Sequence, residues 1–220
     1  MWVAALSDQT ADIVSGLIDN GYAVIDHFLA DAQISTLANE TSTLWQQGAF
    51  RHARIGHGDQ QAKHPEIRND RIHWLNPLVL SQAQANYFEQ LETLRIAINR
   101  QLYLGLFEFE GHLALYPPGS FYGKHLDCFQ DASHRVVTAI LYLNHEWQPA
   151  DGGLLRFYLD ESGEGEYFDI EPLGGRLVVF LSRRYFHEVL PSQRDRMSLT
   201  GWFRVRPLQD EGENLFLSQI

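Results

Sequence analysis

The chain has 220 residues, of which 45% are hydrophobic and 12% aromatic, and its formal net charge is −11. This size and composition predict one domain with a large core. The acidity argues against a nucleic-acid-binding protein, which normally presents a basic face, and no apolar run approaches the roughly 18 residues needed to span a membrane. The single cysteine, Cys128, excludes an intrachain disulfide. We therefore expect a soluble, cytoplasmic protein.

The first 105 residues predict mainly helices. Apolar residues at helical spacing indicate helices over residues 7–21, 31–50 and 81–105, with short strands over 22–29 and 71–76. We expect Asp31 to cap the second helix, Gly48 to end it, and Ile96 to lie on or near the buried side of the third. Residues 50–70 are polar and rich in His, Gly and Gln, so they predict a mobile loop that could serve as a lid.

Residues 106–208 have the composition of a β unit. About eight runs rich in Val, Ile, Leu, Phe and Tyr alternate with turn signals such as "PPGS", "PADGG" and "PLGG". Helices followed by strands predict an α+β fold whose N-terminal helices brace an antiparallel unit. We expect a double-stranded β-helix, that is a cupin-like jelly roll, over 106–208, supported by 1–105 within one domain over 1–220.

Within "FYGKHLDCF", His125 and Asp127 stand two residues apart, and in a strand such residues face the same side. His187 follows an apolar strand and is well placed to join them. Two histidines and one carboxylate leave open metal positions, which is typical of non-haem Fe(II) oxygenases. The HExxH motif of many zinc hydrolases does not occur in the chain. Taken alone, the pair also fits a surface histidine beside an acid, so further residues must decide.

Three residues strengthen the metal hypothesis. Arg196 begins an apolar strand, and an arginine buried in a barrel requires an anion, which it binds with two parallel hydrogen bonds when the anion is a carboxylate. Tyr142 could share that anion, and Tyr116 lies on the strand that leads to the candidate metal ligands. The alternatives are core packing for either tyrosine and a surface ion pair for Arg196, a role that suits Arg194 better.

In "YPPGSFYGKHLD", "HRVVTAILYLNHEW", "GGLLRF", "DIEPLGGRLVVFLSRRYFHEVLPS" and "RMSLTGWF", the chain resembles the prolyl-hydroxylase branch of the Fe(II)/2-oxoglutarate-dependent dioxygenases. It looks most like bacterial relatives of the hydroxylases that act on hypoxia-inducible factor. The resemblance implies that His125, Asp127 and His187 hold Fe(II) and are the catalytic centre. Because Asp127 is present, hydroxylation is favoured over the halogenation of relatives that lack this carboxylate.

The resemblance also implies the residues around the metal. Arg196 would bind the distal carboxylate of 2-oxoglutarate with help from the Tyr142 hydroxyl, and Tyr116 and Thr200 would lie near the proximal end. A second set matches positions on the substrate side of the pocket: Tyr122, Arg135, Trp202 and Asp70. Asp70 would belong to the mobile loop and pair with Arg135.

The function implied by the resemblance is hydroxylation of a proline in a protein substrate, of the peptidyl-proline or procollagen-proline type. The reaction would use 2-oxoglutarate and O2 and release succinate and CO2, with ascorbate as a reductant. We expect a monomer that acts on a protein, a component of the translation machinery being one candidate, and not on nucleic acid or a membrane. The alternatives are a 2-oxoglutarate hydroxylase of a small molecule or another side chain, and a cupin-like metal- or ligand-binding sensor module.

Overall fold

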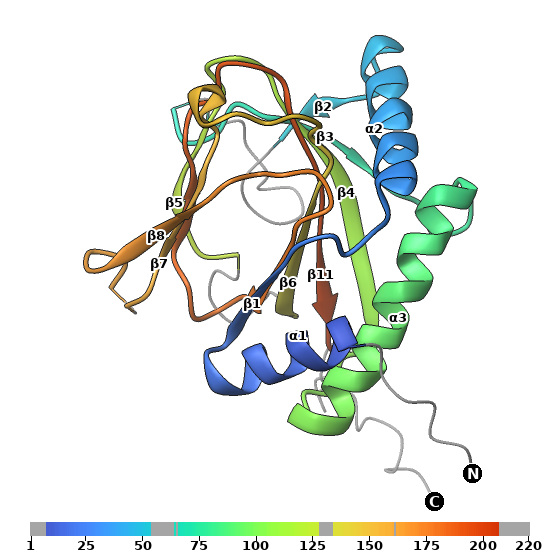
Figure 1. The fold of residues 1–220 in the computed structure, drawn as a ribbon, viewed down its shortest axis with the longest axis vertical. Helices are drawn as coiled ribbons and strands as arrows, with labels where there is room; N and C mark the ends of the chain where they lie inside the picture. The colour runs from blue at the N-terminus through green and yellow to red at the C-terminus, as the bar shows by residue number, and fades with distance from the viewer. Residues whose placement is uncertain (1–7, 54–63, 65, 128–133, 161, 207–220) are drawn as a thin grey trace, which may run out of the picture.

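The computed structural model describes residues 8–53, 64, 66–127, 134–160 and 162–206. Three α-helices in this part of the chain lie where the apolar spacing predicts them: α1 (Asp8–Asp19), α2 (Asp31–Gln46) and α3 (Gln82–Leu102). Figure 1 shows α2 and α3 along the right side of the molecule and α1 across its lower end, and all three contribute to one hydrophobic core with the large β-sheet. None of these helices combines the length and apolar character needed to cross a bilayer.

Two helix details differ from the sequence prediction. The N-cap of α2 is Ala30, not Asp31, which is already the first helical residue; the Ala30 N–H donates to Oε1 of Gln33 over 3.3 Å. On α3 the buried stripe consists of Tyr87, Leu91, Leu94 and Ile98, among others. Ile96 is 39% exposed, because it lies five residues after Leu91 and so faces away from this stripe.

The N-terminal half also contributes three short strands: β1 (Tyr22–Ile25), β2 (Arg51–His52) and β3 (Arg71–Trp74). The strand predicted over 22–29 ends at Ile25, since the chain turns there and His27 adopts a φ of 55°. The first part of the loop predicted over 50–70 instead forms the short strand β2, which pairs with β3. Most of that loop, 54–63 and 65, falls outside the described residues.

Eight strands follow Gly105 in the described chain, the number that the sequence predicts: β4 (Glu108–Tyr116), β5 (Tyr122–His125), β6 (Arg135–Tyr142), β7 (Leu155–Tyr158), β8 (Tyr167–Ile170), β9 (Leu177–Leu181), β10 (His187–Val189) and β11 (Arg196–Arg204). A short 3-10 helix, η2 (Pro149–Asp151), precedes β7. A seven-stranded sheet has the order β1-β9-β6-β11-β4-β3-β2, and a four-stranded sheet has the order β5-β10-β7-β8. The α+β jelly-roll prediction is confirmed.

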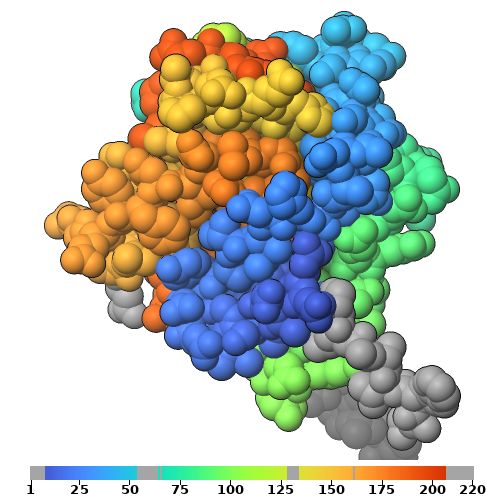
Figure 2. Space-filling view, in the orientation of Figure 1, coloured from blue at the N-terminus to red at the C-terminus, as the bar shows by residue number. Residues whose placement is uncertain are grey.

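Because side chains alternate between the two faces of the large sheet, they contribute to two separate hydrophobic clusters, one on each face. On β11, Leu199 and Phe203 face the helices, in one hydrophobic cluster with Leu91 and Leu94 of α3. The opposite face of the large sheet forms a second cluster with the small sheet. In Figure 2 the blue N-terminal segment, which contains α1, β1 and α2, lies against the yellow and orange part of the β unit. The helices thus stiffen one face of the large sheet and leave its other face to line the space between the sheets.

Candidate metal centre and co-substrate pocket

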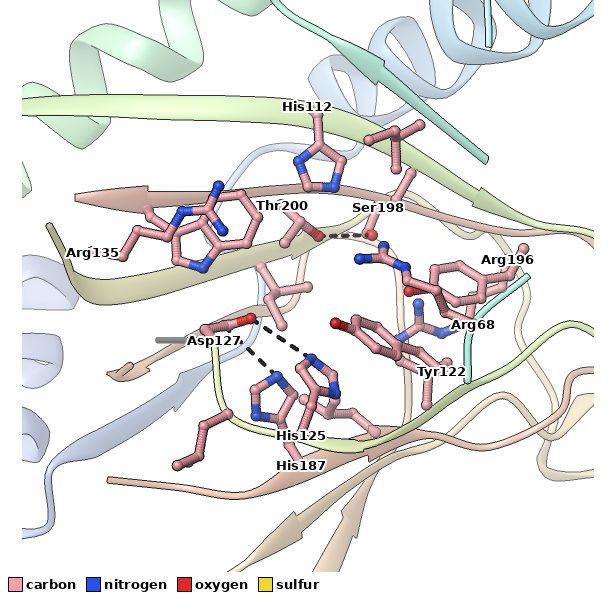
Figure 3. Close-up of a pocket in the computed structure, with 18 of the residues that line it drawn as sticks. Arg68, His112, Tyr122, His125, Asp127, Arg135, His187, Arg196, Ser198 and Thr200 are labelled. Atoms are coloured by element: carbon pink, nitrogen blue, oxygen red, sulfur yellow. Dashed lines mark hydrogen bonds and ion pairs between the residues drawn. The ribbon is translucent and has the colours of Figure 1, made fainter. Parts of the chain in front are cut away.

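His125, Asp127 and His187 lie together between the two sheets. Their ligand atoms all lie within 4.8 Å of one another. His125 ends β5, His187 begins β10, and these two residues are direct partners in the antiparallel pairing of the strands. Nε2 of His125 lies 3.7 Å from Oδ1 of Asp127, and Nε2 of His187 lies 3.7 Å from Oδ2 (Figure 3). The sequence reasoning therefore selected three residues that the fold brings to one point.

Asp127 reaches this point in a different way from the one predicted. β5 ends at His125, so Asp127 lies beyond the strand and does not share a strand face with His125. Its carboxylate is instead held by β6 of the other sheet, where the Thr138 hydroxyl donates to Oδ2 over 2.7 Å. Thr138 also lies 2.9 Å from the hydroxyl of Ser182. The position of the Asp127 carboxylate is therefore set by these two hydroxyls and not by the geometry of a strand.

Both histidines are oriented by backbone carbonyls. Nδ1 of His125 lies 2.8 Å from the Gly123 carbonyl oxygen, and Nδ1 of His187 lies 3.1 Å from that of Tyr185. A carbonyl oxygen can only accept, so Nδ1 carries the proton in both rings. Each Nε2 then presents its lone pair toward Asp127, which is the tautomer that a metal requires.

The protonation states suit a cation. Burial, together with the neighbouring His125, lowers the pKa of His187 to about 4. Burial opposes a charge on Asp127, but His187, His125 and the Thr138 hydroxyl hold the pKa of its carboxyl well below its usual range. Near neutral pH the Asp127 carboxylate is thus ionised and the His187 imidazole beside it is uncharged. This set of donors, buried and presented on one face, fits Fe(II) with further positions open.

Arg196 lies at another end of the same cavity, which has a volume of about 300 Å³. The side chain is 2% exposed, and within the described residues its hydrogen bonding is limited to Nε, which donates to the Gly153 carbonyl over 2.8 Å. Gly153 has a φ of 64°, and a Cβ there would lie 3.1 Å from Cδ of Arg196, so a glycine lets the backbone approach the arginine this closely. The terminal guanidinium nitrogens are left to bind an anion from the cavity.

Two tyrosines flank this guanidinium. Cζ of Arg196 lies 5.1 Å from the ring centre of Tyr116 and 4.9 Å from that of Tyr142. The Tyr142 hydroxyl is buried and has no hydrogen-bond partner in the described chain, and burial raises its pKa, so it remains a donor. An unpartnered donor beside an unpaired buried cation is costly unless a ligand satisfies both. A dicarboxylate such as 2-oxoglutarate, with one end here and the other at the metal ligands, fits this arrangement.

The substrate-side residues predicted from the resemblance also line the cavity, with one change in pairing. Tyr122 stacks on the His125 ring with centroids 3.5 Å apart. Asp70 is fully buried, but it binds Arg68 and not Arg135, with two hydrogen bonds of 2.8 and 2.7 Å. Arg68 in turn lies 4.0 Å from the Tyr122 ring centre. The expected Asp70–Arg135 pair was wrong because Arg68, two residues before Asp70, is the nearer cation.

Arg135 and Trp202 form the wall on the other side. Cζ of Arg135 lies 3.5 Å from the Trp202 ring centre, and its Nε donates to Glu110 over 2.8 Å. Glu110 also accepts from Arg204 over 2.8 Å. Glu110 therefore holds the Arg135 guanidinium over the indole, and Arg204 holds the other oxygen of Glu110.

Thr200 lies on the same face of β11 as Arg196 and Trp202, with its hydroxyl 3.1 Å from that of Ser198. Sequence reasoning missed Ser198, Arg68, Thr138 and His112. Strand alternation could have indicated Ser198, Thr138 and His112, since each stands two or four residues from a residue already selected. Arg68 lies outside a strand, and its contact with Tyr122 depends on tertiary structure.

The comparisons with known proteins agree with this geometry. Residues 111–204 match the family described as the 2OG-Fe(II) oxygenase superfamily. The chain is 31% identical over 214 residues to a hypoxia-inducible factor prolyl hydroxylase of Caenorhabditis elegans, an alignment that takes in 90% of this chain but 28% of that longer protein. It is 29% identical to human prolyl hydroxylase EGLN3 over 203 residues, with 87% of this chain and 81% of that protein covered.

Solved structures extend the likeness. A Pseudomonas putida prolyl-4-hydroxylase is 44% identical with a TM-score of 0.80, and the match covers 90% of this chain and 99% of that one. A Trichoplax adhaerens prolyl hydroxylase, solved in complex with a peptide fragment of the hypoxia-inducible factor oxygen degradation domain, is 28% identical with a TM-score of 0.79, over 96% of this chain and 93% of that one. This chain therefore belongs to the 2OG-Fe(II) oxygenase superfamily and is similar to its prolyl hydroxylases.

Proposed function

We propose that this protein is a 2-oxoglutarate- and O2-dependent hydroxylase of proline in a protein substrate, with succinate and CO2 as co-products. One observation carries the proposal: the His125–Asp127–His187 cluster and the unpaired end of Arg196 face one cavity. The likeness to proteins named as prolyl hydroxylases, at 44% identity for the Pseudomonas putida structure, supports proline as the target.

The protein would supply ligands, orientation and exclusion of water. His125, Asp127 and His187 would hold Fe(II) through the two Nε2 atoms and the carboxylate. Arg196 and the Tyr142 hydroxyl would bind the distal carboxylate of 2-oxoglutarate, with Tyr116 and Thr200 along the co-substrate. When bound, Fe(II), 2-oxoglutarate and O2 together supply the oxidising power for inserting oxygen into an unactivated C–H bond.

Tyr122 and Trp202 would form the walls against which a proline ring packs. Both rings are flat, are backed by arginine, and line the cavity near the metal ligands. Stacking on such surfaces orients a pyrrolidine ring without a charged partner. Arg68 and Asp70 would support this wall, because their ion pair is buried and Cζ of Arg68 lies 4.0 Å from the Tyr122 ring centre.

The test is incubation of the Fe(II)-loaded protein with 2-oxoglutarate, O2 and a panel of proline-containing peptides. We expect the mass of a peptide to increase by one oxygen atom, located on a proline by fragmentation, with one succinate released per hydroxylation. A matched panel with the proline replaced by alanine should give no such product. Succinate formed with product on another residue, or only with a small molecule, would refute the proline assignment.

Finer assignments belong to the same proposal. We propose that the enzyme works as a monomeric single-domain protein in the cytoplasm, that ascorbate serves as its reductant, and that a component of the translation machinery is among its protein substrates. The net charge of −11 supports a protein rather than a nucleic-acid substrate, and the single cysteine suits a reducing compartment. Ascorbate dependence of turnover and co-purification of the substrate protein would test these assignments.

A further inference from the structure

His112 is a buried polar residue of the cavity that the proposed mechanism does not use. It lies on β4, is 4% exposed and lines the cavity. Its imidazole packs beside two indoles, with centroids 5.0 Å from Trp74 and 5.4 Å from Trp202, and the indole centroids lie 6.2 Å from each other, so the three rings form one cluster. Figure 3 shows the ring projecting from β4 beside Thr200 and Ser198, across the cavity from the metal ligands.

Strand register places His112 at the level of the metal ligands. Thr138, which binds Asp127, is the β6 partner of Trp202, and Ile140 is the β6 partner of Thr200. Thr200 is in turn the β4 partner of His112. Arg196 lies four residues before Thr200 on the same strand, about 13 Å away along the chain direction. A dicarboxylate held at its distal end by Arg196 therefore has its proximal end nearer to the His112 level.

The ring nitrogens of His112 have no partner within the described residues. Nδ1 is sealed from solvent and makes no hydrogen bond, so Nε2 is the nitrogen left to face the cavity. Burial, with Arg68 and Arg135 nearby, lowers the pKa of His112 to about 3, so the ring is neutral and can donate only once. A proton on Nε2 leaves Nδ1 as a bare acceptor, which is less costly than a buried N–H with no partner.

We propose that His112 binds the proximal carboxylate of 2-oxoglutarate by donating a hydrogen bond from Nε2. The two indoles hold the imidazole in the orientation that this contact needs, and Thr200 and Ser198 complete the polar patch. His112 thus binds the α-keto acid end of the co-substrate, while Arg196 and Tyr142 bind the distal carboxylate. The inference rests on the proposed use of 2-oxoglutarate and adds a residue that distinguishes it from simpler dicarboxylates.

Binding measurements separate the two ends of the co-substrate. The Fe(II)-loaded protein is titrated without oxygen with 2-oxoglutarate, followed by the visible metal-to-ligand charge-transfer band, and succinate is measured by competition. Succinate lacks the α-keto acid group. His112→Phe keeps an aromatic ring beside the two indoles but removes both nitrogens, and Tyr142→Phe serves as the matched control at the distal end.

For His112→Phe we expect 2-oxoglutarate affinity to fall about tenfold, as for loss of a hydrogen bond to a charged group, with succinate affinity unchanged. Tyr142→Phe should weaken both ligands alike. His112→Gln places an amide near the position of Nε2 and should restore 2-oxoglutarate affinity, whereas His112→Asn, whose amide lies near the position of Nδ1, should not. This pair of variants gives the same comparison even if His112→Phe fails to fold.

Parental affinity for 2-oxoglutarate in His112→Phe, or equal weakening of both ligands, would overturn the role of His112. An effect confined to the KM of a peptide would also overturn it, because His112 would then contact the substrate. The two proposals fail separately. Selective loss of 2-oxoglutarate affinity in a protein that hydroxylates no proline supports the role of His112 and refutes the substrate assignment.

Discussion

The two walls of the cavity are organised in different ways. On the metal side, both Nδ1 atoms are bound by carbonyls and Asp127 is bound by Thr138. On the side of the large sheet, the terminal nitrogens of Arg196, the hydroxyl of Tyr142 and the ring nitrogens of His112 find no partner within the described residues. The metal ligands are therefore oriented before any ligand arrives, whereas the co-substrate wall is completed by what binds there.

This difference has an energetic consequence. A buried polar group without a partner destabilises a protein by about 1–3 kcal/mol, and by more when it is charged. The unpartnered groups of Arg196, Tyr142 and His112, here called the co-substrate wall, therefore lower the free energy of unfolding of the protein without ligand. A bound anion restores this stability. On the metal side, the Thr138 hydroxyl and two backbone carbonyls hold the three ligand side chains whether or not a metal is present, so removal of the metal should leave the fold intact. Substitutions among the metal ligands and among the co-substrate-binding residues should therefore affect stability and ligand affinity differently.

The largest effect is expected for Asp127→Ala. Loss of the carboxylate removes the anionic ligand, so Fe(II) binding and turnover should both disappear. The far-UV circular dichroism and the thermal midpoint should stay close to those of the parent, because Asp127 lies beyond the end of β5. Asp169→Ala, which removes a carboxylate on the outer ion pair with Arg156, is the matched control. An unfolded Asp127→Ala protein would mean that the metal site is structural.

Arg196→Met should lower 2-oxoglutarate affinity about a hundredfold or more, since a fully buried charge pair is lost. The same change should leave the empty protein as stable as the parent or more stable, because an unpaired buried guanidinium is replaced by an apolar chain of similar length. Calorimetry and thermal unfolding of both proteins check this. Arg194→Met, at an exposed ion pair with Asp151, controls for the substitution itself. A large loss of stability in Arg196→Met would contradict the account of the co-substrate wall.

Thr138→Val acts on the metal wall through Asp127. It keeps the shape of the side chain but removes the hydrogen bond to Oδ2, so Fe(II) affinity should fall about 10–100-fold. The affinity for succinate, which Arg196 and Tyr142 would hold, should change little. Fe(II) titration with a competing chelator measures the effect, and Thr138→Ser should restore the parental value. Unchanged Fe(II) affinity would show that Asp127 needs no support from β6.

Tyr142→Phe should have the smallest effect, a loss of about tenfold in 2-oxoglutarate affinity from one hydrogen bond to a carboxylate. Stability of the empty protein should not fall, because the hydroxyl has no partner there. Tyr87→Phe removes another unpartnered buried hydroxyl, on α3, and should leave co-substrate binding unchanged. Equal effects of both substitutions on 2-oxoglutarate would remove the support for Tyr142 as a ligand.

The positions of the helices and strands could be predicted from the periodic spacing of apolar residues. Period-2 alternation indicates the eight strands after Gly105, and helical spacing indicates α1, α2 and α3. It does not determine where a strand stops, which is why Asp127 was expected on a strand face although β5 ends at His125. The three ligands still come together because Thr138, on a strand of the other sheet, holds the carboxylate.

Pairings across the fold were harder to predict than single positions. Arg135 was expected to bind Asp70, but Arg68 binds it, and Arg135 binds Glu110 instead. An ion pair of Asp70 with either arginine would neutralise its charge, so composition and spacing could not determine which arginine binds it. Alternation places His112 on the same strand face as Tyr116, but it does not show whether a lone histidine there binds a ligand or packs in the core.

The metal cluster and Arg196 together would form one site for Fe(II) and 2-oxoglutarate. Anaerobic titration of the protein with Fe(II) and then 2-oxoglutarate, followed by the visible charge-transfer band, tests it most directly. We expect a saturable band in the parent, no band in Asp127→Ala, and a much weaker response in Arg196→Met. A folded parent protein that gives no band, or a band that is unaffected by both substitutions, would contradict it.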